Sequence, residues 1–285
     1  MINLTQYSAL IDSPRTIIMG VLNVTPDSFS DGGKFVDPEI AATHGSRMIS
    51  EGADIIDVGG MSTRPPGSAY GVGAEPVTLE EELLRVIPVI EKIKRNHPDA
   101  LISIDTTKAE VARKSLEVGA TIINDVSGAT EEPEILDVAR SFGAPIILMH
   151  GYGSEFRKEK IEDYVYSDVV KEVFDWLLAR RTAAWDRGVT DVLADIGFGF
   201  AKTSDDNIKL LAHHKAFKKL GVPMLIGVSR KSTIGKMLGG GVPPEERIIG
   251  SISAAIYAAM HGAKIIRTHD VKETKQALMV LEALR

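Results

Sequence analysis

Residues 15–35, RTIIMGVLNVTPDSFSDGGKF, join an apolar run to a long polar segment. The run at residues 16–22 is rich in Ile, Val and Leu, which is typical of a strand buried on both faces. It stops at Asn23, and the segment that follows carries hydroxyls, carboxylates and two glycines. A simple connector needs only about two to six residues. The longer polar loop therefore predicts a ligand site at the end of this strand.

Apolar runs of the same kind recur along the chain. The other seven lie at residues 54–58, 101–104, 121–124, 145–149, 191–193, 223–228 and 264–267. Most are continuous rather than alternating, which indicates parallel strands covered on both faces.

Segments with helical periodicity separate these runs. Asp37 and Pro38 predict the start of the first helix, and Thr78 with Glu81 predicts a capping box before the second. Thr107 with Glu110 predicts the same device one helix later. The remaining helical stretches lie at residues 133–142, 164–187, 205–220, 244–261 and 272–284.

Eight strand and helix pairs favour an α/β fold of the closed (β/α)8 type, the TIM barrel. We expect a single domain over residues 1–285, with residues 1–14 capping the bottom of the barrel. The alternative is an open doubly wound sheet. That fold would favour G-x-G-x-x-G at the start of the first helix, and the sequence lacks it.

The composition narrows the class of protein. A net charge of −6 argues against nucleic-acid binding, and the absence of cysteine excludes disulfide scaffolds, cysteine zinc sites and thiol catalysis. The N-terminal residues do not resemble a signal peptide, and no apolar run is long enough to span a membrane. We therefore expect a cytoplasmic protein that binds neither nucleic acid nor membrane.

Polar residues follow nearly every apolar run. They are Asn23, Asp57, Asp105, Asn124 with Asp125, His150, Asp195, Ser229 to Ser232, and Arg267 with His269. Any one of them could be a turn former or a helix cap, and Asp57 fits that interpretation best because Gly59 and Gly60 follow it. As a set at one rim of a barrel they predict an active site.

The chemistry of these residues divides into two halves. Arg267 and His269 are two residues apart and can both donate to one anion, and Lys231 adds a further cation near a helix start. Asp105, Asn124 and Asp195 suit a planar, nitrogen-rich heterocycle. A heterocycle that carries phosphate would satisfy both halves. The alternative is that the cations pair with the aspartates in buried salt bridges.

Seven motifs, in order, resemble those of the dihydropteroate synthase family. They are LNVTPDSFSDGGKF (22–35), DVGGMSTRPPG (57–67), SIDTTK (103–108), INDVSG (123–128), DIGFGFAK (195–202), SRKS (229–232) and RTHD (267–270). The resemblance implies a TIM barrel that joins 4-aminobenzoate to 6-hydroxymethyl-7,8-dihydropterin pyrophosphate. The products would be 7,8-dihydropteroate and pyrophosphate, and the enzyme would be a homodimer.

The same resemblance implies roles for individual residues. The pterin would contact Asp105, Asn124, Met149, Asp195, Gly227 and Lys231. Pyrophosphate would contact Asn23, Arg267 and His269, with Mg2+ held beside it at Asn23. The catalytic residues would be Asp105, Lys231, Arg267 and His269.

The 4-aminobenzoate pocket would form as the first two loops close. Its implied residues are Phe29, Asp31, Thr63, Arg64, Pro65, Phe200, Lys231 and Ser232. Phe200 could instead pack as core at the top of the barrel.

The sequence departs from the family pattern at several places. Met61 stands where an acidic residue is common, residues 66–73 lengthen the second loop, and Ile196 replaces a proline. A sulfonamide-insensitive synthase is therefore one alternative. Others are a corrinoid-dependent methyltransferase that uses a methylated reduced folate, and a catalytically silent pterin-binding paralogue.

Overall fold

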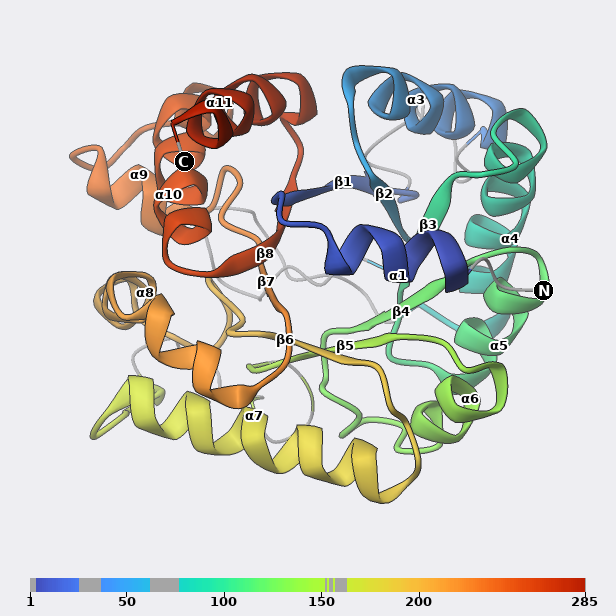
Figure 1. The fold of residues 1–285 in the computed structure, drawn as a ribbon, viewed down its shortest axis with the longest axis horizontal. Coiled ribbons are helices and arrows are strands. Elements are labelled where there is room, and N and C mark those ends of the chain that lie inside the picture. The colour runs from blue at the N-terminus through green and yellow to red at the C-terminus, as the bar shows by residue number, and fades with distance from the viewer. Residues whose placement is uncertain are drawn as a thin grey trace.

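Eight parallel strands pair in chain order and close into a barrel (Figure 1). The computed structural model describes residues 4–25, 37–61, 77–151, 153, 156 and 163–284. The strands are β1 (Ile17–Asn23), β2 (Ile55–Gly59), β3 (Leu101–Asp105), β4 (Ile122–Asp125), β5 (Ile146–Met149), β6 (Val192–Asp195), β7 (Met224–Ile226) and β8 (Ala263–Thr268). The predicted (β/α)8 TIM barrel is confirmed.

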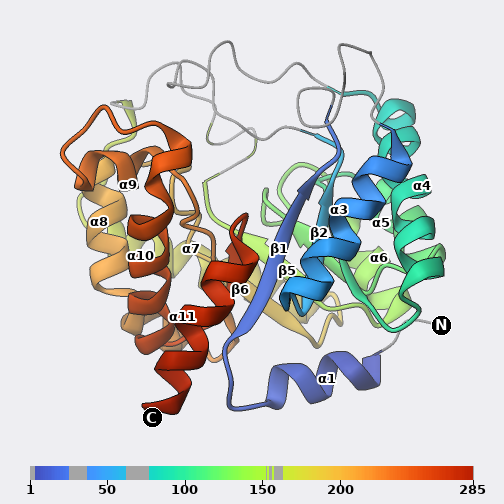
Figure 2. The ribbon, with the colours of Figure 1, turned by 90° about the horizontal axis from the view of Figure 1, so that it is seen from above.

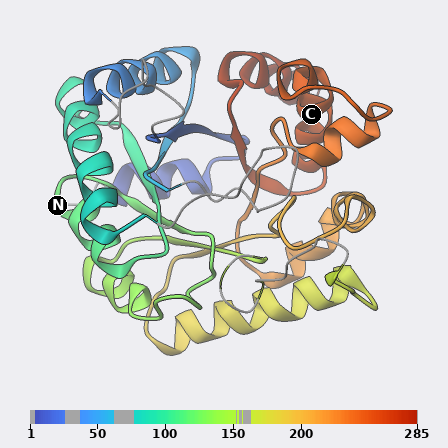
Figure 3. The ribbon, with the colours of Figure 1, turned by 180° about the vertical axis from the view of Figure 1, so that it is seen from behind.

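Helices form a layer around the strands (Figures 1 and 3). They are α3 (Pro38–Glu51), α4 (Leu79–Asn96), α5 (Ala109–Glu117), α6 (Ile135–Phe142), α7 (Val169–Asp186), α8 (Ser204–Ala212), α9 (Ser232–Met237), α10 (Ile248–Met260) and α11 (Val271–Ala283). Two 3-10 helices, η3 (His214–Leu220) and η4 (Pro244–Arg247), lie before β7 and α10. The stretches predicted as single helices at residues 205–220 and 244–261 are therefore each divided in two.

The strands are buried on both faces, as their continuous apolar runs predicted. A small cluster fills the barrel with one side chain from most strands, among them Ile17, Ile55 and Leu225. A much larger cluster lies between the strands and the helices, where Ile18 and Ile56 take the opposite face. Alternate side chains of one strand thus enter different cores, because successive residues point to opposite faces.

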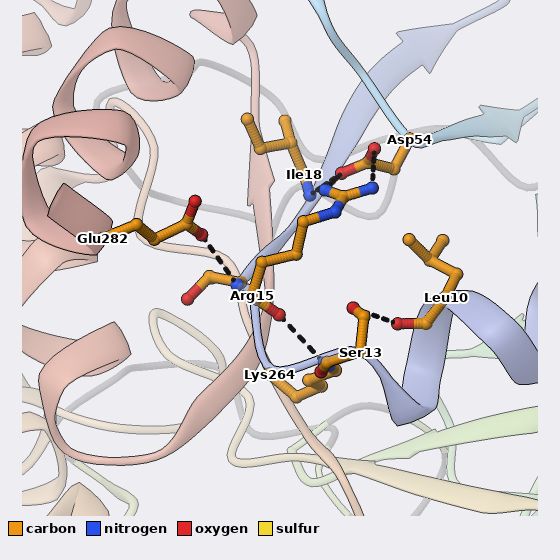
Figure 4. A network of polar contacts seen from close by, with 8 residues as sticks. Leu10, Ser13, Arg15, Ile18, Asp54, Lys264 and Glu282 are labelled. Carbon is orange, nitrogen blue, oxygen red and sulfur yellow. Dashed lines mark hydrogen bonds and ion pairs between the residues drawn. The ribbon is translucent and has the colours of Figure 1, made fainter. Parts of the chain in front are cut away.

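Helix α1 (Leu4–Asp12) lies across the N-terminal end of the barrel (Figure 2). Its Tyr7 is buried among the side chains that fill the barrel, and the Tyr7 hydroxyl donates to Asp191 Oδ1 over 3.1 Å. An ion pair and hydrogen bonds hold residues 13–15, which follow α1 (Figure 4). The two terminal nitrogens of Arg15 donate to the Asp54 oxygens over 2.8 and 2.7 Å, and Lys264 Nζ donates to the Ser13 and Arg15 carbonyls.

Two predicted helix starts are confirmed, at Asp37 with Pro38 and at Thr78, and a third is wrong. Thr78 accepts from the Glu81 amide over 3.2 Å at the start of α4. The capping box at Thr78 is only half formed, because the Glu81 carboxylate binds Arg85.

Thr107 does not cap α5, because Lys108 occupies the cap position and the Ala109 amide donates to Glu132 Oε2 over 2.8 Å. The acceptor comes from the next connection in the chain, which local spacing does not reveal.

None of the helices that the structure describes is long and apolar enough to cross a membrane.

Candidate active site

The strand register brings the predicted polar positions into adjacent places at one end of the barrel. Asn23 pairs with Gly59, Gly59 with Asp105, and Asp105 with Asn124. Further round, the last residue of β5, Met149, pairs with Asp195, the last residue of β6. Since all eight strands are parallel, these C-terminal ends share one rim.

Arg267 of β8 connects two other strands, β2 and β3, across this rim. Its Nε donates to Asp57 Oδ2 over 2.6 Å, and its Nη2 donates to Asp105 Oδ2 over 2.8 Å. Asn124 Nδ2 donates to the same Asp57 oxygen over 3.1 Å. The interpretation of the cations as salt-bridge partners is therefore correct for Arg267.

Asp57 is more than a turn residue. It lies inside β2 and is fully buried, and it accepts from both Arg267 and Asn124. Its second oxygen, Oδ1, has no hydrogen-bond partner among the described residues. The glycines that follow Asp57 predicted a turn residue. The structure shows instead that Asp57 orients two predicted ligand residues, Asn124 and Arg267.

Asp105 and Asp195 are both buried carboxylates with cations beside them. Burial raises the pKa of Asp105, while Arg267 opposes that effect. Burial also raises the pKa of Asp195, opposed mainly by Lys231 and by the Gly197 amide, which donates to Asp195 Oδ1 over 2.8 Å. Each carboxylate therefore lies in a desolvated position that favours a ligand with hydrogen-bond donors.

Lys231 is half-buried at the start of α9, opposite Arg267. Its ammonium donates to the Phe198 carbonyl and lies 4.5 Å from the centre of the Phe200 ring. Burial lowers the pKa of Lys231 to about 8, although Asp195 raises it. Lys231 and Phe200, both predicted for the 4-aminobenzoate pocket, are thus brought together. The alternative interpretation of Phe200 as buried core is not supported, because its side chain is only half-buried.

The ends of β7 and β8 are joined by a second group of polar contacts. Ser229 Oγ contacts Nδ1 of the exposed His269 at 3.0 Å and accepts from the His269 amide over 3.2 Å. Arg230 donates to both oxygens of Asp270. These contacts keep Ser229, Lys231 and His269 near one another.

The other predicted residues differ in accessibility. Asn23 is half-buried at the end of β1, and within the described residues its side-chain amide has no hydrogen-bond partner. Met149 is buried at the end of β5, Gly227 follows β7, and Ser232 is exposed as the first residue of α9. Phe29, Asp31, Thr63, Arg64 and Pro65 lie outside the described residues.

Two of the polar residues at strand ends, Asp125 and His150, make contacts outside this group of site residues. Asp125 accepts from the amides of Ser127 and Ala129, so it shapes the turn after β4. His150 is buried in an aromatic cluster, with ring centres 4.8 Å from Phe156 and 5.0 Å from Trp176. Both residues therefore make structural contacts within the fold.

Comparison with known proteins establishes the family. Residues 19–269 match the family model described as pterin binding enzyme. The chain is also 47% identical to the dihydropteroate synthase of Synechocystis sp., over 95% of this chain and 90% of that protein. The chain belongs to the dihydropteroate synthase family of pterin binding enzymes.

Solved structures of this family have the same fold. The Xanthomonas albilineans dihydropteroate synthase with 4-aminobenzoic acid is 44% identical, with a TM-score of 0.85 and coverage of 96% of this chain and 94% of that chain. The same enzyme in complex with 7,8-dihydropteroate gives 41% identity, a TM-score of 0.81 and the same coverage. The motifs quoted from the sequence thus indicated the correct family.

Two polar residues of the DIGFGFAK region have structural partners that the sequence did not reveal. Asn207 Oδ1 accepts from the Gly199 amide over 2.7 Å. Lys202 is almost completely buried and donates to three backbone carbonyls. Lys202 was visible as a motif residue, but only the folded loop shows what the two side chains bind.

Proposed function

We propose that the chain catalyses the dihydropteroate synthase reaction at the rim formed by Asn23, Asp105, Asn124, Asp195, Lys231 and Arg267. The amine nitrogen of 4-aminobenzoate bonds to the methylene carbon of 6-hydroxymethyl-7,8-dihydropterin pyrophosphate. The carbon–oxygen bond to pyrophosphate breaks, the leaving group keeps the electron pair, and the amine loses a proton. The observation that carries the proposal is the placement of two buried carboxylates opposite two cations within one barrel mouth.

The pterin half of the site is formed by Asp105, Asn124 and Asp195, with Met149 and Gly227 along the ring. Asp195 can accept two N–H groups from the amino-pyrimidine edge, a planar geometry that gives specificity. Among the described residues, the Asp195 carboxylate accepts a hydrogen bond only from the Gly197 amide. A ring without those donors would leave a desolvated carboxylate unpaired, which is costly.

The leaving-group half is formed by Asn23, Arg267 and His269. Arg267 uses two of its five N–H groups on Asp57 and Asp105, so it retains donors for a phosphate oxygen. The Ser229 hydroxyl holds the His269 ring at the rim. These groups stabilise negative charge as it develops on the departing oxygen.

A magnesium ion fits this donor set. The described residues contain no group of three or more acidic, histidine or cysteine side chains that could hold a metal. Mg2+ commonly takes one or two protein oxygens and shares substrate phosphate oxygens. We propose the side-chain oxygen of Asn23 as the protein ligand, because this amide has no hydrogen-bond partner among the described residues. When bound, Mg2+ would neutralise pyrophosphate charge.

The chain's own side chains supply the remaining stabilisation. Asp105, held by Arg267, can stabilise positive charge on the pterin after the carbon–oxygen bond breaks. Lys231 lies between Asp195 and the Phe200 ring, so it can contact both substrates. Phe29, Asp31, Thr63, Arg64, Pro65 and Ser232 complete the 4-aminobenzoate pocket in this proposal.

We also propose that two copies of the chain associate through α10 and α11. A shallow apolar hollow on these helices is lined by Ile256, Met260, Ala277, Val280, Leu281 and Leu284. Val280 is 62% exposed and Leu284 81% exposed, which favours a covered surface. A Val280→Glu variant should then shift from dimer to monomer in light scattering, and a monomeric wild type would contradict the proposal.

The decisive experiment mixes the two substrates and measures both pyrophosphate and dihydropteroate, with Mg2+ and with a chelator. We expect both products in equal amounts, and a strong loss of rate with the chelator. Methyl transfer to a corrinoid without pyrophosphate would favour the methyltransferase. Intact pterin binding with no turnover would favour a silent paralogue, and a parallel assay with a sulfonamide tests the insensitive variant.

A further inference from the structure

The loop at residues 197–201, after β6, has its backbone carbonyls bound by side chains. Lys202 Nζ donates to the Phe200 carbonyl over 2.8 Å and to the Gly197 carbonyl over 3.1 Å. Lys231 donates to the Phe198 carbonyl, and the Tyr166 hydroxyl donates to the Ala201 carbonyl over 2.9 Å. Side-chain donors, rather than a strand or helix ladder, therefore determine the shape of this loop.

Lys202 also joins this loop to the neighbouring strand. Its third donor reaches the carbonyl of His150, directly after β5, at 3.4 Å. An ammonium has three donors, so these three carbonyls use them all. The side chain is only 2% exposed and cannot bind a substrate itself.

The backbone is folded closely around the Lys202 ammonium. A Cβ at Gly197 would lie 1.6 Å from the His150 carbonyl oxygen, and one at Gly151 would lie 2.9 Å from Lys202 Nζ. Both glycines have positive φ, so no other residue fits easily there. This close fit shows that the loop and the ammonium form one packed unit.

The held loop presents an aromatic ring to the active site. The Phe200 ring lies 4.5 Å from Lys231 Nζ, while the Phe200 carbonyl on the same residue is bound to Lys202. If Lys231 turns toward the pterin, its bond to the Phe198 carbonyl is lost. Lys202 is then the ammonium that still holds the loop in place.

We propose that Lys202 is a positioning residue that sets the affinity for the aromatic amine substrate by fixing the Phe200 ring. This inference rests on the proposed function, in which 4-aminobenzoate lies against Phe200. Lys202 touches no reacting atom and acts through the Gly197, Phe200 and His150 carbonyls. Burial lowers the pKa of Lys202 to about 7, and the carboxylates of Asp195 and Asp206 oppose that effect.

The test is Lys202→Met, which keeps chain length and removes the donors. We expect the KM for 4-aminobenzoate to rise about tenfold, the order expected when hydrogen bonds to a charged group are lost. The KM for the pterin pyrophosphate should rise much less. Asp105 and Asn124 belong to other strands, and of the three polar residues in the pterin half only Asp195 interacts with Lys202.

Lys264→Met is the matched control. Lys264 also donates to two backbone carbonyls, those of Ser13 and Arg15, but at the opposite end of the barrel. This variant should lower the melting temperature and leave both KM values unchanged. If Lys202→Met instead raises both KM values equally, or changes only the melting temperature, the inference is overturned.

A double-mutant cycle with Phe200→Leu tests whether Lys202 acts through that ring. The two substitutions together should raise the KM for 4-aminobenzoate by less than the product of their separate effects. Independent, fully multiplicative effects would contradict the inference.

Tyr166→Phe is the alternative variant for this test if Lys202→Met fails to fold. It removes one hydrogen bond from the same loop, and we expect a smaller rise in the same KM. No rise would overturn the inference.

Wild-type product formation separates the two proposals. Absence of dihydropteroate overturns both, whereas product formation with an unchanged KM in the variants overturns only the role of Lys202.

Discussion

Two carboxylates fix the position of Arg267. Its hydrogen bonds to Asp57 and Asp105 hold the plane of the guanidinium across the barrel mouth. Asp57 in turn is held by Asn124 and is completely shielded from solvent. Donors fixed in this way need little reorganisation as charge develops in the transition state, which is a main source of electrostatic catalysis.

Arg267→Ala should lower kcat/KM roughly a hundredfold or more. This corresponds to a loss of several kcal/mol of transition-state stabilisation. It removes a donor to the leaving group and leaves Asp57 and Asp105 without their cation. Steady-state kinetics with both substrates measures the effect. Arg267→Lys retains the charge but loses the forked geometry, so it should recover only part of the activity. Wild-type turnover in the alanine variant would remove Arg267 from the mechanism.

Asp57→Asn should reduce kcat/KM by about tenfold to a hundredfold, the size of one lost charge-assisted hydrogen bond. The substitution keeps the shape of the side chain and weakens its hold on Arg267. Asp54→Asn is the control, because Asp54 also binds an arginine, Arg15, at the far end of the barrel. We expect that control to lower stability and leave kcat/KM unchanged. Equal kinetic effects in both variants would contradict a specific role for Asp57.

At the scale of elements, local sequence predicted the strands better than the helix starts. The eight apolar runs overlap the eight strands, because burial on both faces demands continuous Ile, Val and Leu. Helix starts depend on whichever acceptor is nearest. Glu132 satisfies the Ala109 amide where Thr107 was expected to cap, and Asp168 caps α7 where a start near Tyr164 was expected.

Helix α1 contributes stability at the closed end of the barrel. Tyr7→Ala should lower the free energy of unfolding by about 3 kcal/mol, since it opens a cavity among the side chains that fill the barrel. Urea denaturation measures this. Tyr7→Phe should cost only about 1 kcal/mol, because it loses just the hydrogen bond to Asp191. Both variants should keep wild-type KM values, and altered substrate affinity would show that α1 influences the site.

Over the whole molecule, buried neutral histidines make stability depend on pH. His214 is fully buried and its ring nitrogens have no partner among the described residues. Burial lowers the pKa of His214 from its ordinary value of 6.5 to about 4. Between pH 6.5 and about pH 4, the imidazole of His214 binds a proton in the unfolded chain but stays neutral in the folded chain. The free energy of unfolding should therefore fall as pH falls through this window.

His214→Leu should remove part of that dependence. We expect the wild type to lose about 2 kcal/mol more than the variant between pH 7 and pH 5. Urea denaturation across this range measures the difference. His213→Leu, at the exposed neighbouring position, is the control and should behave as wild type. Parallel pH curves for His214→Leu and wild type would contradict a role for this residue.

The order of the motifs indicated the family, and the alternation of strands and helices indicated the barrel. Both follow from local chemistry: hydrophobic runs of strand length, and polar residues placed where those runs end. The sequence also selected Asp105, Asn124, Asp195, Lys231 and Arg267, which the structure places at one rim. Their roles toward the pterin and pyrophosphate remain predictions.

What the sequence by itself determined was the set of chemical groups and the strand on which each lies. The tertiary structure decided how these groups pair, because pairing depends on strands far apart in the chain. Asp57 and Arg267 are separated by 210 positions and meet over 2.6 Å. Lys202 was a motif residue without a role until the folded loop placed three carbonyls around its ammonium. A buried charge must find acceptors, and only the closed barrel determines which ones lie within reach.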